Sequence, residues 1–220
     1  MSSFSVPAYS LIRDEIKQGI ISGIWPLGQH ITIAELCKHF SVSANPIREA
    51  LLQLQGEGII DMRMNRGALV PVVDESYVHN VCRLRSAIQA MLASEAAISA
   101  TPEQVDQLKL LVDEHAAAAK SCDTAATVKA NRTFHHYVDS IAKNPQALDV
   151  LASRTSLLDA YRRAIGYEHS RLDRVVVQHR KLVYAISRGD PEKAAAASRE
   201  HTETARIDLI SAIKKKAKQA

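Results

Sequence analysis

Apolar positions follow two different patterns along the chain, and the change falls near residue 72. Before it, helical spacing persists only over short stretches interrupted by turn-forming residues. After it, long segments rich in alanine, leucine and valine keep a helical period between proline- and glycine-containing turns. We therefore predict two domains, covering residues 1–72 and 73–220.

Most of the predicted elements are helices. In the first domain the pattern predicts helices near 6–22, 33–40 and 44–56, then a strand pair over 59–72 that turns at Asn65-Arg66-Gly67. In the second it predicts helices near 74–99, 102–121, 123–143, 145–165, 169–188 and 191–216. The fold class expected is mainly α.

Capping signals support several helix starts. Thr32 and Glu35 have the spacing of a capping box. Ser43 is expected to cap the third helix, and Thr101 and Asp190 are expected to cap two later helices that begin with proline.

The third helix has one apolar stripe and one polar flank. The stripe consists of Ile47, Ala50, Leu51 and Leu54. Asn45 and Arg48 lie on the opposite flank, in the first turns. Two short helices joined by a tight turn, with polar residues starting the second, are typical of a helix-turn-helix, and the strand pair would form its wing.

This arrangement suggests how the first domain would read double-stranded DNA. Arg48 has the bidentate fork suited to guanine, and Asn45 suits adenine or phosphate. Ser43 and Arg66 would position the domain on the phosphate backbone, and Gly67 would let the wing tip approach it closely. The same elements are also compatible with a winged domain that binds another protein.

Composition and charge limit these options only in part. The 220 residues are 46% apolar, 24% charged and only 5% aromatic, which is typical of a helical globular protein and excludes collagen-like, disordered and disulfide-rich chains. The formal net charge of +4 arises entirely after residue 72, because residues 1–72 hold six basic and six acidic residues. DNA binding by the first domain would therefore depend on a few well-placed arginines.

Few features of the sequence bear on where the protein is located in the cell. Cys37, Cys82 and Cys122 are an odd set without CxxC spacing, which indicates reduced, mostly buried thiols. The chain has neither a secretory signal pattern nor an apolar run of the roughly 20 residues that a bilayer requires. We expect a cytoplasmic protein with no membrane partner.

Three histidines are expected on inward helix faces of the second domain. His135 shares its face with Asn131, whereas His136 points about 100° away, toward the surface. His179 and His201 lie among apolar residues of two other helices. Each could be an ordinary core histidine, or the three could share zinc or another first-row metal ion inside a helical bundle.

Long segments of the chain resemble a known family. AELCKHFSVSANPIREALLQLQGEGII, followed by NRGALV, resembles the winged-helix domain of GntR-type bacterial transcription regulators. RLRSAIQAMLASEAA, NRTFHHYV, QHRKLVYAISRGDPEKAA and SREHTE resemble the FCD ligand-binding domain of the FadR branch. The resemblance implies a winged helix-turn-helix followed by an all-α FCD-type bundle, and a homodimeric regulator, most often a repressor, that binds a DNA operator.

The resemblance also implies a ligand site. The family's metal ligands correspond to Asn131, His135, His179 and His201, for a divalent metal that is zinc by preference, with nickel or manganese as alternatives. The implied effector is a small organic acid, whose carboxylate would meet Arg85.

Three positions depart from the family pattern. Alanine replaces a frequent arginine at Ala34 and Ala44, which leaves more of the DNA contact to Arg48. Asparagine replaces aspartate at Asn131, so a metal held there would keep its full charge of +2 and attract a carboxylate more strongly.

Two assignments stay open at this point. Asp139 is either an acidic metal ligand in place of Asn131, or a residue of the surface or of the metal's outer shell. Arg83 or Arg85 either binds the effector or pairs with a neighbouring helix.

An enzyme is the main alternative to a regulator. Three histidines could activate a metal-bound water. However, the chain has no HExxH motif and no paired carboxylates, and Glu200 points about 100° away from His201 on its helix. We therefore expect that the protein is not an enzyme.

Overall fold

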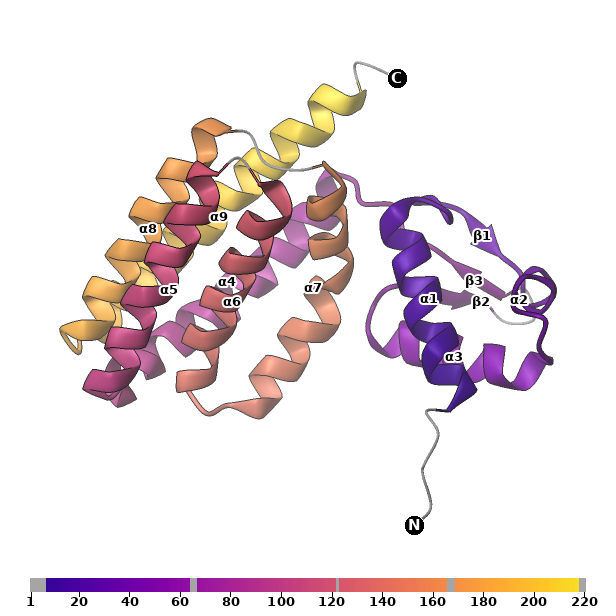
Figure 1. Cartoon of the computed structure of the whole chain (residues 1–220), viewed down its shortest axis with the longest axis horizontal. Coiled ribbons are helices and arrows are strands. Elements are labelled where there is room, and N and C mark those ends of the chain that lie inside the picture. Colours follow the sequence, from indigo (N-terminus) through magenta and orange to yellow (C-terminus); the bar gives the residue numbers. More distant parts are fainter. Residues whose placement is uncertain (1–6, 64–66, 122, 166–168, 218–220) are drawn as a thin grey trace, which may run out of the picture. The chain divides into compact units, whose positions relative to one another are not determined.

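A computed structural model gives the fold and describes residues 7–63, 67–121, 123–165 and 169–217 (Figure 1). The chain divides into two compact units, which are described separately: Met1–Asp74 with Ala152–Ala164, and Glu75–Leu151 with Ile165–Ala220. Across the described residues there are nine helices and three short strands, which confirms the mainly α prediction.

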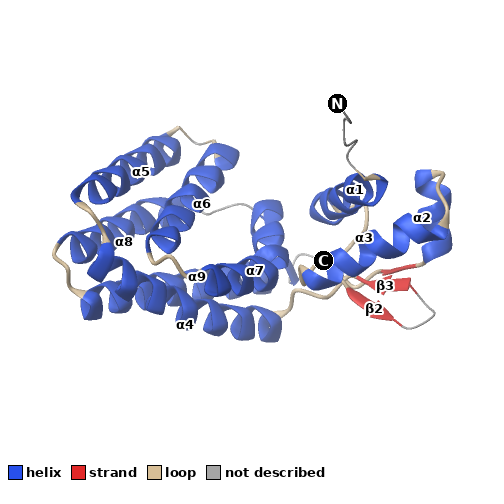
Figure 2. Ribbon diagram, turned by 90° about the horizontal axis from the view of Figure 1, so that it is seen from below, coloured by secondary structure: helices blue, strands red, loops and turns tan. Residues whose placement is uncertain are grey.

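The first unit, which we call the head, contains three helices, a small sheet and the second part of a further helix (α7, Pro145–Ile165). Its elements are α1 (Ala8–Ser22), β1 (His30–Ile31), α2 (Ile33–Phe40), α3 (Ala44–Gly56), β2 (Asp61–Arg63) and β3 (Gly67–Leu69). The strands are antiparallel in the order β1-β3-β2, with Ala68 opposite both Ile31 and Met62. Figure 2 shows β2 and β3 side by side. β1 was not predicted, because two residues are too short to show the alternation of a strand.

The two predicted caps in the head have different outcomes. The Thr32–Glu35 capping box is confirmed, because each residue's backbone N–H donates to the other's side chain. The predicted Ser43 cap is wrong in its hydrogen bond: Ser43 occupies the N-cap position of α3, but its side chain makes no cap bond. Pro46 stands at the third helical position and has no N–H to donate there.

The core of the head confirms the apolar stripe predicted for α3, since all four of its residues are fully buried. Other fully buried side chains of the unit include Ile16, Ile31, Leu36, Ile59 and Ile60. With this face of α3 buried, its polar flank is directed to solvent.

The second unit is a helical bundle. Its helices are α4 (Glu75–Ser99), α5 (Pro102–Lys120), α6 (Thr124–Ile141), the first part of α7 (Pro145–Ile165), α8 (His169–Ser187) and α9 (Pro191–Ala217). The Thr101 and Asp190 caps are confirmed, because these side chains accept from the backbone N–H groups of Gln104 and Lys193. α4 packs along α9, while α5 contacts both α6 and α8.

The bundle core includes Leu108, Phe134, Val138, Val183 and Ile186. Cys82 is buried and Cys37 is half-buried, whereas Cys122 lies outside the described residues. Among the helices described, none is long and apolar enough to cross a membrane.

Candidate nucleic-acid interface and metal centre

The N-terminal end of α3 presents the polar side chains predicted to contact DNA. Arg48 and Asn45 are both exposed on the face opposite the buried stripe, and Ser43 is exposed directly before the helix. Because the Ser43 hydroxyl is not used for capping, it can hydrogen-bond an external group. Ala34, at the start of α2, is also exposed and offers no such group.

Gly67 differs from what the sequence suggested. It lies in β3 and is buried, with a left-handed φ of 93°. A Cβ atom on Gly67 would stand 2.2 Å from the carbonyl oxygen of Ile31 and 2.9 Å from Cα of Thr32. Glycine is therefore required here by the close approach of β1, and not by exposure at a wing tip. Asn65 and Arg66 lie outside the described residues.

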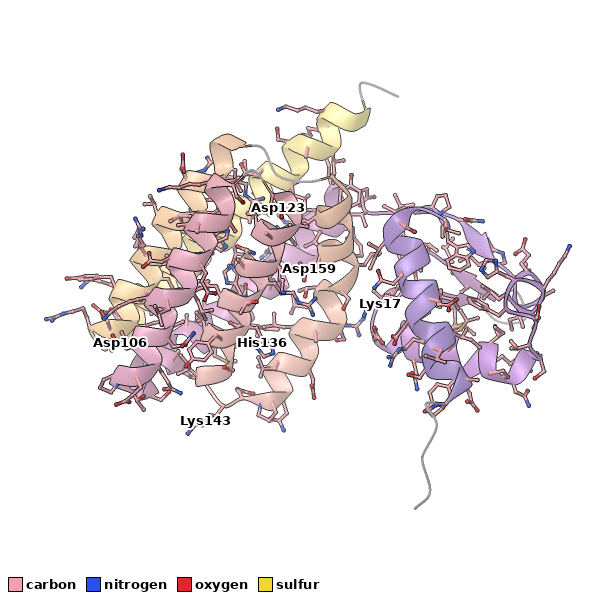
Figure 3. The ribbon with its side chains drawn as sticks, in the orientation of Figure 1. Lys17, Asp106, Asp123, His136, Lys143 and Asp159 are labelled. Carbon is pink, nitrogen blue, oxygen red and sulfur yellow. The ribbon has the colours of Figure 1, made fainter. Side chains whose placement is uncertain are left out.

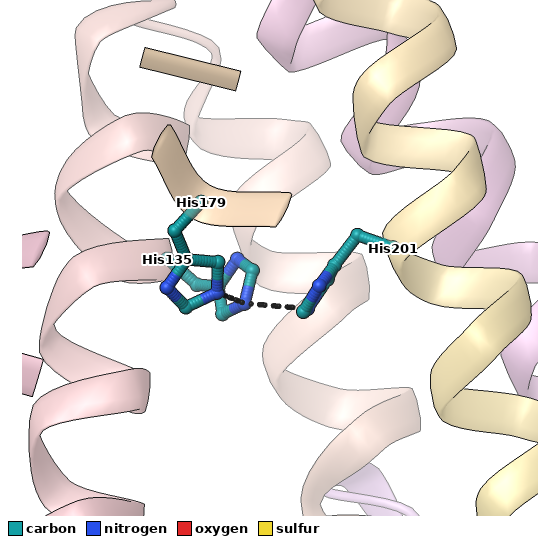
Figure 4. Close-up of side chains that lie close together, drawn as sticks. All are labelled: His135, His179 and His201. Carbon is teal, nitrogen blue, oxygen red and sulfur yellow. Dashed lines mark hydrogen bonds between the residues drawn. The ribbon is translucent and has the colours of Figure 1, made fainter. Parts of the chain in front are cut away.

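The bundle brings three histidine side chains together from three helices (Figure 4). Nε2 of His135 on α6 lies 3.0 Å from Nε2 of His201 on α9 and 3.3 Å from Nε2 of His179 on α8. The three rings are 8%, 7% and 1% exposed, respectively. By contrast, the neighbouring His136, labelled in Figure 3, is exposed as predicted.

The two distances from His135 fit a shared metal ion, and the ligand atoms of all three histidines lie within 4.8 Å of one another. Two nitrogens that each lie about 2.1 Å from one ion are about 3.0–3.4 Å apart at octahedral or tetrahedral angles. Without an ion, Nε2 of His135 faces two nitrogens but carries either one proton or one lone pair, so it satisfies only one of the two contacts. A cation would satisfy three lone pairs at once.

Hydrogen bonding fixes the tautomer of His201. Nδ1 of His201 lies 3.0 Å from Oε1 of Gln178, whose Nε2 donates to Oγ1 of Thr204. Since the amide oxygen only accepts, Nδ1 of His201 carries the proton and Nε2 keeps its lone pair. Outer partners of this kind orient the histidine ligands of metal sites.

His179 has the electrostatic state that a ligand needs. Burial, and then the nearby imidazoles of His135 and His201, hold the pKa of His179 well below its usual value. Its ring is therefore uncharged at neutral pH, as metal binding requires. The ring of Phe134 stacks on it at a centroid distance of 4.1 Å.

A second polar group lies one turn further along α6. Oδ2 of Asp139 accepts a hydrogen bond of 3.1 Å from Nε2 of Gln89, and Oε1 of Gln89 accepts one of 2.8 Å from Nε of Arg85. Asp139 is 7% exposed, and burial raises its pKa to about 6. Of the alternatives open for Asp139, the surface position is therefore wrong, and a place in the metal's outer shell or as a ligand stays a prediction.

The remaining predicted residues of the ligand site differ in their exposure to solvent. Asn131 is half-buried on α6, one turn before His135. Arg83 is exposed, whereas Arg85 is half-buried and linked to the buried Gln89, so Arg85 is the better placed of the two arginines for an internal ligand.

Comparison with known families identifies both units. The family model "Bacterial regulatory proteins, gntR family" matches residues 8–70, and the model "FCD domain" matches residues 80–204. The chain belongs to the GntR family and carries an FCD domain. It is a DNA-binding transcriptional regulator and not an enzyme.

Individual GntR regulators are similar to this chain over most of their length. The transcriptional repressor RspR of Escherichia coli K12 is 26% identical over 194 residues, covering 88% of this chain and 83% of its own. The Uxu operon regulator of Haemophilus influenzae is 25% identical over 225 residues, covering 92% and 82%. The solved structure of E. coli McbR/YncC has the same fold, with a TM-score of 0.71 at 20% identity, covering 94% of this chain and 98% of that chain.

Sequence reasoning missed three polar residues of this GntR regulator. Gln178, which orients His201, and Gln89, which contacts Asp139, were not singled out, and neither was His115, a fully buried histidine on α5. Helical phase did offer a signal for His115, because it follows Leu108, Leu111 and Val112 on the buried face of α5.

Proposed function

We propose that this GntR regulator is a homodimeric repressor of the FadR branch, whose operator affinity is controlled by a small carboxylic acid bound at a metal centre. Residues 1–72 would read the DNA, and residues 73–220 would bind the effector and form the dimer. The observation that carries this proposal is the convergence of His135, His179 and His201 on one buried point within the FCD domain.

The metal would be zinc, with nickel and manganese as alternatives, held by these three histidines and by the amide oxygen of Asn131. Imidazole nitrogen suits zinc and nickel, and the set of four neutral ligands leaves the ion's charge of +2 uncompensated. When bound, the ion supplies a positive, coordinatively open seat for a carboxylate. Arg85 would bind the effector's carboxylate from α4.

On DNA, Arg48 would read guanine in the major groove, and Asn45 would contact a base or phosphate. Ser43, Arg66 and the wing formed by β2 and β3, with Gly67 at the start of β3, would position the head on the backbone. Effector binding would change the relative populations of two arrangements of the paired heads, so that control needs no new contact at the DNA.

The test is an anisotropy titration with duplexes that the full chain itself selects from a random pool. We expect sequence-specific, salt-dependent binding that a subset of small carboxylic acids weakens only in zinc-loaded protein. Absence of specific binding would refute the assigned reading head. Binding that carboxylic acids leave unchanged, with and without zinc, would refute the assigned control.

A further inference from the structure

A fourth histidine lies against the three-histidine cluster. The ring of His115, on α5, has its centroid 5.0 Å from that of His179, with the ring planes inclined by 38°. Both side chains are 1% exposed. His115 thus reaches the cluster from a helix that contributes none of the three converging Nε2 atoms.

Each of the two neighbouring rings has a buried nitrogen without a hydrogen-bond partner. Nδ1 of His115 and Nδ1 of His179 are both buried and have no hydrogen-bond partner among the described residues. A buried polar atom without a hydrogen-bond partner is destabilising. His201 shows the alternative within the same cluster, because its Nδ1 is bonded to Gln178.

The chemistry of a metal-bound imidazole makes the two atoms complementary. If His179 gives the lone pair of Nε2 to an ion, its proton must stand on Nδ1, which then needs an acceptor. Phe134 covers a face of the His179 ring and has no acceptor to offer. An uncharged His115 has one nitrogen lone pair available.

We propose that His115 is a positioning residue of the metal centre, which accepts a hydrogen bond from Nδ1–H of His179 through one buried water, since the two rings make no direct hydrogen bond. This bond holds His179 in the tautomer whose Nε2 is unprotonated and directed at the ion. The inference rests on the proposed metal centre, and it predicts that His115 affects metal affinity without being a ligand.

The first test is a zinc-affinity measurement on the full chain, by competition with a chromophoric chelator. His115→Phe keeps a ring of similar size but removes both nitrogens, whereas His115→Gln restores an acceptor. We expect zinc affinity to fall about 10- to 100-fold in His115→Phe and to recover to within a few-fold in His115→Gln. The control His136→Phe, at the exposed neighbour of His135, should bind zinc as the wild type does.

A second readout is the tautomer of His179 in metal-free protein, from nitrogen-15 NMR of histidine-labelled chain. The wild type and His115→Gln should show the proton on Nδ1, and His115→Phe should lose this preference. Wild-type zinc affinity in His115→Phe, or an equal loss in both variants, would overturn the proposal. If His115→Phe fails to fold, a wild-type His179 protonated on Nε2 would overturn it equally. If the wild type itself binds no zinc, the metal centre fails, and the tautomer still decides the role of His115.

Discussion

Nε2 of His135 lies 3.0 Å from Nε2 of His201, although 66 residues separate the two histidines in sequence. Both rings are buried, and the proton of His201 is held on the opposite nitrogen by Gln178. The α6–α9 packing thus directs a lone pair of His201 at a neighbouring nitrogen. Without an ion, this lone pair can accept from Nε2–H of His135, but the second contact of that nitrogen, to Nε2 of His179 at 3.3 Å, is then left unsatisfied. A cation would satisfy all three nitrogens at once.

Removing one histidine of the cluster should abolish tight metal binding. We expect about one equivalent of zinc per chain in the wild type and below about 0.1 equivalent in His201→Ala, measured by elemental analysis after zinc exposure and desalting. The exposed histidine variant His136→Ala is the matched control and should retain the wild-type content. Zinc at 100 times its dissociation constant should stabilise the wild type by about 2.7 kcal/mol. A wild type that stays metal-free would contradict the site.

Truncating Arg48 should weaken operator binding without unfolding the head, because its side chain is exposed and outside the core. Loss of a bidentate base contact costs about 1–3 kcal/mol, which is roughly a 5- to 150-fold loss of affinity. Fluorescence anisotropy on the selected operator measures this loss. Arg199→Ala removes an exposed arginine from α9 and should leave affinity unchanged. Equal affinities of Arg48→Ala and wild type would exclude α3 as the reading helix.

Adding a methyl group at Gly67 should destabilise the head. Alanine there combines a left-handed backbone with a contact of 2.2 Å to the Ile31 carbonyl oxygen, and we expect a loss of about 1–3 kcal/mol or more. Gly56→Ala is the control, because Gly56 is helical and a Cβ there meets nothing within 4 Å. It should be neutral or stabilising by about 0.5–1 kcal/mol. The single tryptophan, Trp25, lies in the head, so its fluorescence during denaturation reports this unit. Equal stability of the two variants would show that β1 can move away.

The buried Asp139 should make the stability of the bundle depend on pH. Its pKa is about 6 in the folded chain against a model-compound value of 3.8, so the folded state binds the extra proton between these pH values. The free energy of unfolding therefore falls as the pH rises from about 4 to 6, and it stays reduced above pH 6. Asp139→Asn keeps an acceptor for Gln89 and should be more stable than the wild type at pH 7.5 by up to about 3 kcal/mol, with the difference vanishing toward pH 4.

Circular dichroism melts across this pH range measure the effect. Asp149→Asn makes the same change of net charge at an exposed position of α7 and should give a flat difference from wild type. A wild-type-like profile for Asp139→Asn would mean that the carboxylate is ionised at little cost in the folded chain.

Local features of the sequence predicted the helices well. Helix starts and ends lie within two residues of the expected positions, because periodicity, capping residues and prolines act over one or two turns. The same local logic placed Arg48 and Asn45 outside and Ile47 and Leu51 inside. Prediction from local features failed for β1, because two residues show no strand alternation. It also failed for the Ser43 cap, because Pro46 has no backbone N–H to donate to the Ser43 side chain.

The sequence by itself determined which residues face inward on each helix, and therefore that His135, His179 and His201 would be buried. Only the tertiary structure decided that their Nε2 atoms meet, that Gln178 selects the tautomer of His201, and that Asp139 is enclosed beside Gln89. The physical reason is range: helical phase is set by neighbours a few residues away, whereas nitrogen-to-nitrogen distances depend on how separate helices pack against one another.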